Sequence, residues 1–180
     1  MRAAIFGFCL GFLLFGCAPK PPPRWAEGGA PLVIAPARWE RGDDDWIEIR
    51  ENGQVLEDGD LLFVIDRVGR VTDGDYEALA VLLPDGHLAG TDNRSLGQVG
   101  VANAAPPGAV QAWLAITPDG RVTYFDADGE RSAGGVWRGC SGPQQRTCTL
   151  VTQMLLVRHY RDANQSGVGV GVGVGIGVGF

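Results

Sequence analysis

The middle of the chain alternates short runs of β-prone residues with turns that contain glycine. The clearest run, residues 46–50, alternates polar and apolar positions strictly, which places Ile47 and Ile49 on one face of a strand. Asn52-Gly53 follows one residue later and is the strongest short signal for a hairpin in the chain. Since a further β-prone run continues beyond it, the pattern predicts a β-hairpin here.

Four more turns of the same kind are predicted along the chain. They are Arg67-Val68-Gly69, Pro84-Asp85-Gly86, Pro118-Asp119-Gly120 and Asp126-Ala127-Asp128-Gly129. Asp-Gly pairs suit turn positions at which φ is above zero, and a proline before the pair fixes its own φ at a value that suits the start of the turn. We therefore predict an all-β domain over residues 39–163: an antiparallel meander of about eight to ten strands, closed as a small barrel or folded as a sandwich.

One segment near the end of this domain is ambiguous. Residues 148–157 are continuously apolar or threonine-rich, so periodicity does not separate a central strand from a helix. Thr147, Thr149, Val151 and Thr152 are β-branched and favour a strand. A strand is the prediction here, with a helix as the alternative.

The first residues have the pattern of an export signal. Met1 and Arg2 are followed by an uncharged apolar run of 14 residues, Ala3 to Gly16. A helix that spans a bilayer needs about 20 apolar residues, so this run is too short to cross and fits the core of a signal peptide. Residues 1–16 are therefore predicted to be a signal peptide.

Leu14-Phe15-Gly16-Cys17 resembles the lipobox of bacterial lipoproteins, in which a cysteine after a small residue receives the lipid. The resemblance implies that Gly16 is the last residue removed and that Cys17 becomes an N-terminus carrying palmitate-type acyl chains. Several acyl chains give stable membrane anchoring, where one would be reversible. Ala18 stands where lipoproteins kept at the inner membrane commonly have Asp, so the resemblance implies the outer membrane of the cell envelope.

The segment after Cys17 is rich in proline. Six of the chain's 11 prolines lie between Cys17 and Pro36, and three of them are consecutive. Such a run favours the extended polyproline II conformation. We predict that residues 17–38 form a spacer that holds the domain away from the membrane.

The four cysteines divide by position. Cys9 falls within the signal peptide and Cys17 is the lipidation site, which leaves Cys140 and Cys148. Seven residues separate these two, a spacing that suits a disulfide in an exported protein. Zinc would need two more ligands, and neither histidine is suitably spaced.

Charge and motifs exclude several functions. The formal charge is −6 and the basic residues do not cluster, so nucleic acid is not a predicted partner. The motifs of hydrolases, zinc proteases and phosphate-binding loops are missing, and we predict no enzymatic activity, no cofactor and no metal. The acidic turns contain oxygen ligands that calcium prefers, but their spacing departs from an EF-hand loop.

Two tryptophans are candidates for ligand binding. Trp46 lies on the polar face of its predicted strand, and Trp113 is expected on the polar face of a strand over residues 110–117. An indole on a polar face can stack on a sugar ring, whereas a covering layer would make it a core residue.

The C-terminal tail, residues 164–180, ends in a strict alternation of glycine with valine, isoleucine and phenylalanine from Gly167 to Phe180. Glycine at every second position disfavours a helix. Three interpretations stay open: a disordered tail, a strand that pairs with its own domain or with another chain, and a membrane strand, since the terminal Phe resembles the last strand of outer-membrane barrels.

These features predict a lipid-anchored protein of the cell envelope, non-enzymatic, with a structural or assembly role. The membrane is the predicted partner of the N-terminal lipid, and self-association or an envelope partner is predicted for the tail. The alternative is a polysaccharide- or peptidoglycan-binding module that uses Trp46 and Trp113.

Overall fold

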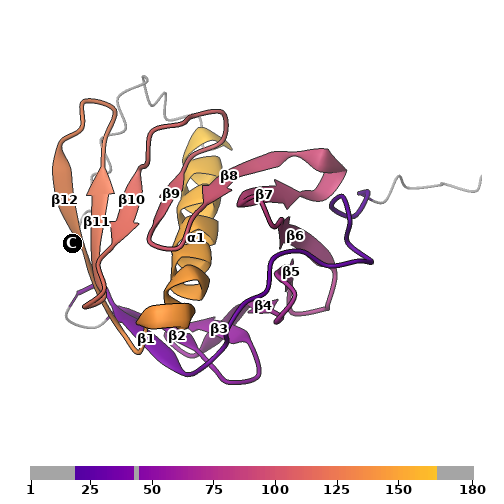
Figure 1. Ribbon diagram of the computed structural model, residues 1–180, viewed down its shortest axis with the longest axis horizontal. Helices are drawn as coiled ribbons and strands as arrows, with labels where there is room; N and C mark the ends of the chain where they lie inside the picture. The colour runs from indigo at the N-terminus through magenta and orange to yellow at the C-terminus, as the bar shows by residue number, and fades with distance from the viewer. Residues whose placement is uncertain (1–18, 43–44, 166–180) are drawn as a thin grey trace, which may run out of the picture.

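The computed structural model describes residues 19–42 and 45–165, and in these residues the chain forms twelve β-strands and one α-helix (Figure 1). The strands are β1 (Ala37–Glu40), β2 (Trp46–Ile49), β3 (Gln54–Glu57), β4 (Asp60–Ile65), β5 (Arg70–Thr72), β6 (Ala78–Leu82), β7 (His87–Gly90), β8 (Ser95–Val99), β9 (Asn103–Ala105), β10 (Leu114–Ile116), β11 (Arg121–Phe125) and β12 (Arg131–Arg138). Short 3₁₀ turns, η1 (Thr91–Asn93) and η2 (Gly142–Gln144), precede β8 and the helix α1 (Gln145–Gln165).

The strands form one closed antiparallel barrel. Each strand pairs with its neighbours in sequence, and β1 pairs with β12 to complete the ring. The predicted all-β meander is therefore confirmed in its barrel form, with more strands than the sequence indicated. The two tryptophans Trp39 and Trp137 face each other across the closing pair of strands and stack with ring centroids 5.5 Å apart.

The predicted hairpin is confirmed as β2 and β3. Ile49 lies opposite Val55, and the Arg50 N–H donates to the Gln54 carbonyl across the turn. Gly53 adopts φ +84°, and a Cβ atom there would lie 2.0 Å from the Ile65 carbonyl oxygen, so glycine is required. The four other predicted turns join β4 to β5, β6 to β7, β10 to β11 and β11 to β12.

The ambiguous segment is a helix, so the predicted strand over residues 148–157 is wrong. Thr149 and Thr152 donate from their hydroxyls to the carbonyls of Gln145 and Cys148, four residues earlier, which accommodates threonine in a helix. Every side chain from Thr147 to Gln153 is buried. Without a polar face the segment has no helical period, which is why the sequence pattern did not reveal it.

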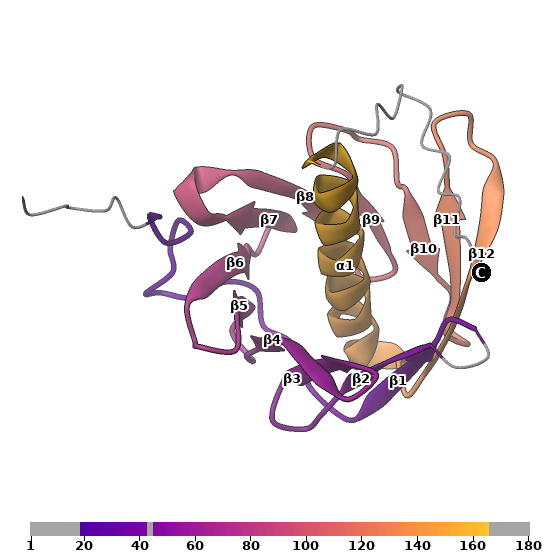
Figure 2. The same ribbon diagram turned by 180° about the vertical axis from the view of Figure 1, so that it is seen from behind.

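The helix α1 runs through the barrel (Figures 1 and 2). Twelve strands spaced about 4.8 Å apart and tilted by about 40° give a radius of roughly 12 Å. A helix with its side chains is about 10–12 Å across, so the barrel has room for one helix and an inner layer of wall side chains. The core accordingly contains residues of both: Ile47, Val55, Ile65, Leu82, Leu88 and Leu114 from the wall, and Cys148, Leu150 and Val151 from α1.

The two ends of the barrel differ. Because the meander alternates direction, the turns after odd-numbered strands lie at one end and those after even-numbered strands at the other. The helix starts after β12 and leaves the barrel beside the turns that follow the odd-numbered strands, which we call the open end. The opposite end, where α1 begins, is called the closed end.

The second half of the N-terminal segment covers the closed end, and Lys20 in its first half is hydrogen-bonded to Asp92, so the prediction of a free spacer over residues 17–38 is wrong for the described residues 19–38. Ala30, Leu32 and Ile34 are buried in the core, and Gly29 and Ala30 donate backbone hydrogen bonds to Val68 and Leu82. The prolines predict an extended backbone for this segment, and its backbone is extended. Its alternate apolar residues nevertheless pack against the barrel and attach the segment to it. The domain thus begins before Trp39.

Several predicted features lie outside the described residues: the signal peptide, the lipidation site Cys17 and the glycine-valine repeat after residue 165. Among the described helices, none is long and apolar enough to cross a membrane.

Candidate functional site at the open end of the barrel

A buried glutamine anchors the middle of α1 to the barrel wall. The Gln153 amide nitrogen donates to the carbonyls of Leu96 and Ala105, at 2.7 and 3.1 Å. Its amide oxygen accepts a hydrogen bond of 2.6 Å from the indole N–H of Trp113. Gly97 makes this approach feasible, because a Cβ atom there would lie 2.4 Å from the Gln153 amide nitrogen. The helix is therefore fixed in position by specific polar contacts as well as by packing.

Further hydrogen bonds attach α1 around its circumference. The Trp137 indole donates to the Thr152 hydroxyl at 3.1 Å, and the Thr149 hydroxyl shares its one hydrogen between the Gln145 carbonyl and the Val101 carbonyl, which lies at 2.8 Å. At the start of the helix the Gln145 side-chain amide donates to the Ile116 carbonyl at 2.7 Å. Buried polar side chains thus have partners in the wall, which sets the depth and rotation of the helix.

The predicted disulfide between Cys140 and Cys148 is confirmed, with Cα atoms 6.1 Å apart and both residues buried. It joins the loop after β12 to the first turn of α1 at the closed end. The bond fixes where the helix enters the barrel.

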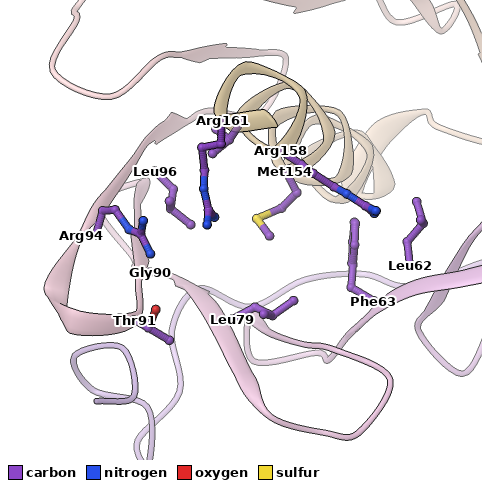
Figure 3. A pocket seen from close by; sticks show the side chains of 11 residues that line it. Leu62, Phe63, Leu79, Gly90, Thr91, Arg94, Leu96, Met154, Arg158 and Arg161 are labelled. Atoms are coloured by element: carbon purple, nitrogen blue, oxygen red, sulfur yellow. The ribbon is translucent and has the colours of Figure 1, made fainter. Parts of the chain in front are cut away.

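A hollow of about 360 Å³ lies between the emerging part of α1 and the wall at the open end (Figure 3). Its lining is mainly apolar and comes from four strands and the helix: Leu62 and Phe63 of β4, Leu79 of β6, Gly90 of β7, Leu96 of β8, and Met154 and Val157 of α1. Leu62, Leu79 and Met154 are only partly buried, so apolar surface faces this space.

Three arginines surround the hollow. Arg94 comes from the turn between β7 and β8, while Arg158 and Arg161 come from neighbouring turns of α1. Figure 3 shows Arg94 and Arg161 extending toward one another from opposite sides, with Arg158 above Phe63. Among the described residues, none of these guanidinium groups forms an ion pair. The site therefore combines apolar walls with three arginines that form no salt bridge within residues 19–42 and 45–165.

Acidic residues dominate the remaining turns of the open end. They are Asp45, Glu57, Asp58, Asp60, Asp73, Asp75, Glu77, Asp126, Asp128 and Glu130. Arg41 binds Asp45 and Glu57; burial alone would lower the pKa of Arg41, but its hydrogen bonds to these carboxylates outweigh it and raise the pKa. Burial raises the pKa of the Tyr124 phenol in the same region. The three arginines are thus a local basic spot on an acidic rim.

The two candidate tryptophans do not form a platform. Trp113 is 8% exposed, because β10 begins only at Leu114 and the indole turns inward to Gln153, contrary to the expected polar face. Trp46 is half-buried on the outer face of β2, with the Arg38 guanidinium 4.5 Å from its ring centre. The strands β2 and β10 are not neighbours in the barrel. The sugar-binding alternative needs exposed indoles, and Trp113 does not provide one.

No family model, curated protein or solved structure matches this chain. The kind of ligand that this site could bind is therefore inferred from the residues that line it. Among the described residues, no three His, Cys, Asp or Glu side chains gather as a metal site would require. An apolar hollow with two converging guanidinium groups, those of Arg94 and Arg161, has the composition of a binding site for a small anionic molecule. No sequence motif points directly to this site, apart from the spacing of Arg158 and Arg161, which places both on one helix face.

Proposed function

We propose that this protein is a lipid-anchored, non-enzymatic component of the cell envelope, located at the outer membrane, with a structural or assembly role. The observation that carries the assembly role is the closure of the barrel: every described strand has a neighbour on both sides. A closed barrel offers no free edge, so the alternating glycine-valine tail has no strand of its own domain to extend. Its β-prone pattern is then available for pairing with another copy or with an envelope partner.

The position of the chain ends supports this proposal. Lys20 is tied to the turn between β7 and β8, because its N–H donates to the Asp92 carboxylate at 3.0 Å and its carbonyl accepts from the Asp92 N–H at 2.9 Å. Cys17 is three residues away, a span of at most about 10 Å. The proposed lipid anchor and the tail that follows α1 would both leave from the open end.

The test uses three forms of the full-length protein. Val172→Asp with Val174→Asp places two charges on the apolar face of the tail, and Val172→Thr with Val174→Thr is the matched control of similar shape. We expect self-association or envelope association, measured by cross-linking in native membranes, to be lost in the Asp variant and retained in the Thr variant. Thermal unfolding of the barrel should be unchanged in both.

If the Asp variant associates like the parent, the tail has no assembly role. The anchor is tested separately by intact-mass analysis of membrane-extracted protein, which should show acyl mass on Cys17. A free thiol at that position would exclude the anchor without affecting the result for the tail.

A further inference from the structure

We propose that the hollow at the open end binds a single-chain anionic amphiphile, with its acyl chain against the apolar lining and its carboxylate or phosphate between Arg94 and Arg161, and with Arg158 adding positive charge at the same site. This inference goes beyond the assembly role and does not depend on it. It assigns a ligand class to a site in the described part of the chain.

The volume and lining of the hollow set the size of the chain. A water-sized group occupies about 30 Å³ in a liquid, so about 360 Å³ corresponds to roughly twelve such groups. That matches one acyl chain of about ten to twelve carbons and is too small for a lipid with two long chains. Leu62, Leu79 and Met154 would become covered by the chain, which removes their exposed apolar surface from water.

The arginines set the charge of the head group. Arg94 and Arg161 extend toward each other from the wall and from the helix, an arrangement in which two like charges repel unless an anion lies between them (Figure 3). Guanidinium groups match carboxylate and phosphate through paired N–H donors. In the part of the chain that the structure describes, the three groups form no salt bridge, so an anion would be bound there without breaking one.

The surrounding charge favours one small ligand over an extended anionic surface. Acidic residues occupy the turns between β3 and β4, between β5 and β6 and between β11 and β12 at the same end. A flat surface of anionic head groups would meet these carboxylates as well as the arginines and be repelled. The head group of one small ligand can contact the arginines without approaching these carboxylates.

The test measures binding of dodecanoate by titration calorimetry, below its micelle-forming concentration. The protein is the full-length chain with Cys17→Ser, so that no acyl chain of an anchor competes. Dodecanoate should bind with one-to-one stoichiometry, and neutral dodecanol should bind about tenfold more weakly or worse, because it lacks the charge-assisted hydrogen bonds. Higher salt should weaken the binding of dodecanoate but not the binding of dodecanol, because only dodecanoate is charged. Dodecyl phosphate is measured in parallel, and tighter binding of either anion supports the proposal and identifies the head group.

Two variants locate the site, and a third serves as a control. Arg158→Gln with Arg161→Gln changes exposed helix positions and should weaken dodecanoate binding about tenfold or more. Leu79→Trp should fill the hollow and abolish binding of both the acid and the alcohol. Arg67→Gln, at an exposed arginine of the closed end, should leave binding within about twofold of the parent.

Three results would overturn the proposal: equal binding of dodecanoate and dodecanol, unchanged binding in the arginine variant, or binding that appears only after residues 166–180 are removed. The last result would mean that the tail itself occupies the hollow. If Leu79→Trp fails to fold, the arginine variant decides alone, since its changes lie on the surface of α1.

Discussion

Replacing Gln153 with leucine tests whether polar contacts hold α1 inside the barrel. Leucine is close to glutamine in volume, so packing is largely kept while three hydrogen bonds are lost. The indole N–H of Trp113 and the carbonyls of Leu96 and Ala105 would each lose this partner. A buried polar group without a partner costs about 1–3 kcal/mol, and carbonyls tolerate the loss better than an indole N–H.

We therefore expect Gln153→Leu to lower the free energy of unfolding by about 3–5 kcal/mol, a large part of the roughly 5–15 kcal/mol typical of a domain. The measurement is urea unfolding with the disulfide intact, followed by tryptophan fluorescence. The matched control is Gln111→Leu, at an exposed glutamine in the loop before β10, which should change the free energy by less than about 0.5 kcal/mol.

A double-mutant cycle isolates the bond between the amide and the indole. Trp113→Phe removes the indole N–H, so the combination with Gln153→Leu no longer leaves that donor unsatisfied. The double variant should be more stable than the sum of the single changes by about 1–2 kcal/mol. Additive effects, or a cost below about 1 kcal/mol for Gln153→Leu, would refute the reasoning that these hydrogen bonds hold the helix.

Three other changes test the fold. Replacing Cys140 and Cys148 with alanine should lower the free energy of unfolding by about 2.5 kcal/mol, on the chain-entropy estimate for a short loop, as measured by urea unfolding. Gly97→Ala should cost about 3 kcal/mol or more, since its Cβ atom would lie 2.2 Å from a carbonyl oxygen, whereas Gly42→Ala, with no atom within 4 Å, should be neutral. Burial raises the pKa of Tyr124 above the value of about 10 in the unfolded chain, so above that pH the unfolded state loses its proton first and stability falls as pH rises. Tyr124→Phe should remove that alkaline slope in thermal unfolding, and a slope unchanged in the variant would assign it to other groups.

The strands and turns could be predicted because their signals are local. Ile47 and Ile49 alternate with polar residues since one face of β2 meets the core and the other meets solvent. Asn52-Gly53 identifies its turn because only a few residues adopt positive φ easily. These signals do not depend on which other part of the chain supplies the core.

The helix and the N-terminal segment could not be predicted in the same way. A surface helix reveals itself by a polar face, but α1 has the wall of the barrel on all sides over residues 147–153, and tertiary contacts override the strand preference of its threonines. In the N-terminal segment the prolines predict a spacer, whereas the alternate apolar residues Ala30, Leu32 and Ile34 pack in the core. The alternation over residues 110–117 predicts one strand, but β10 begins only at Leu114, so Trp113 lies outside the strand and its predicted face is wrong.

The arginine site could not be predicted from the sequence for a different reason. Arg94 and Arg161 are distant in sequence and come together only because the turn between β7 and β8 and the end of α1 lie at the same end of the barrel. Both positions depend on the closed barrel, which is completed by the pairing of β1 with β12, and no local sequence pattern predicts that pairing.

The enclosed helix also has a consequence for the order in which the molecule can form. All twelve strands precede α1 in the chain, yet their inward side chains have no partner to pack against until residues 145–157 are present. The pairing of β1 with β12 adds a contact between distant parts of the chain, which slows folding. A chain that has been synthesised only as far as β12 is a sheet with one bare apolar face and is prone to aggregate. Premature termination before α1 should therefore yield insoluble protein, whereas loss of residues beyond the helix should leave the barrel able to close.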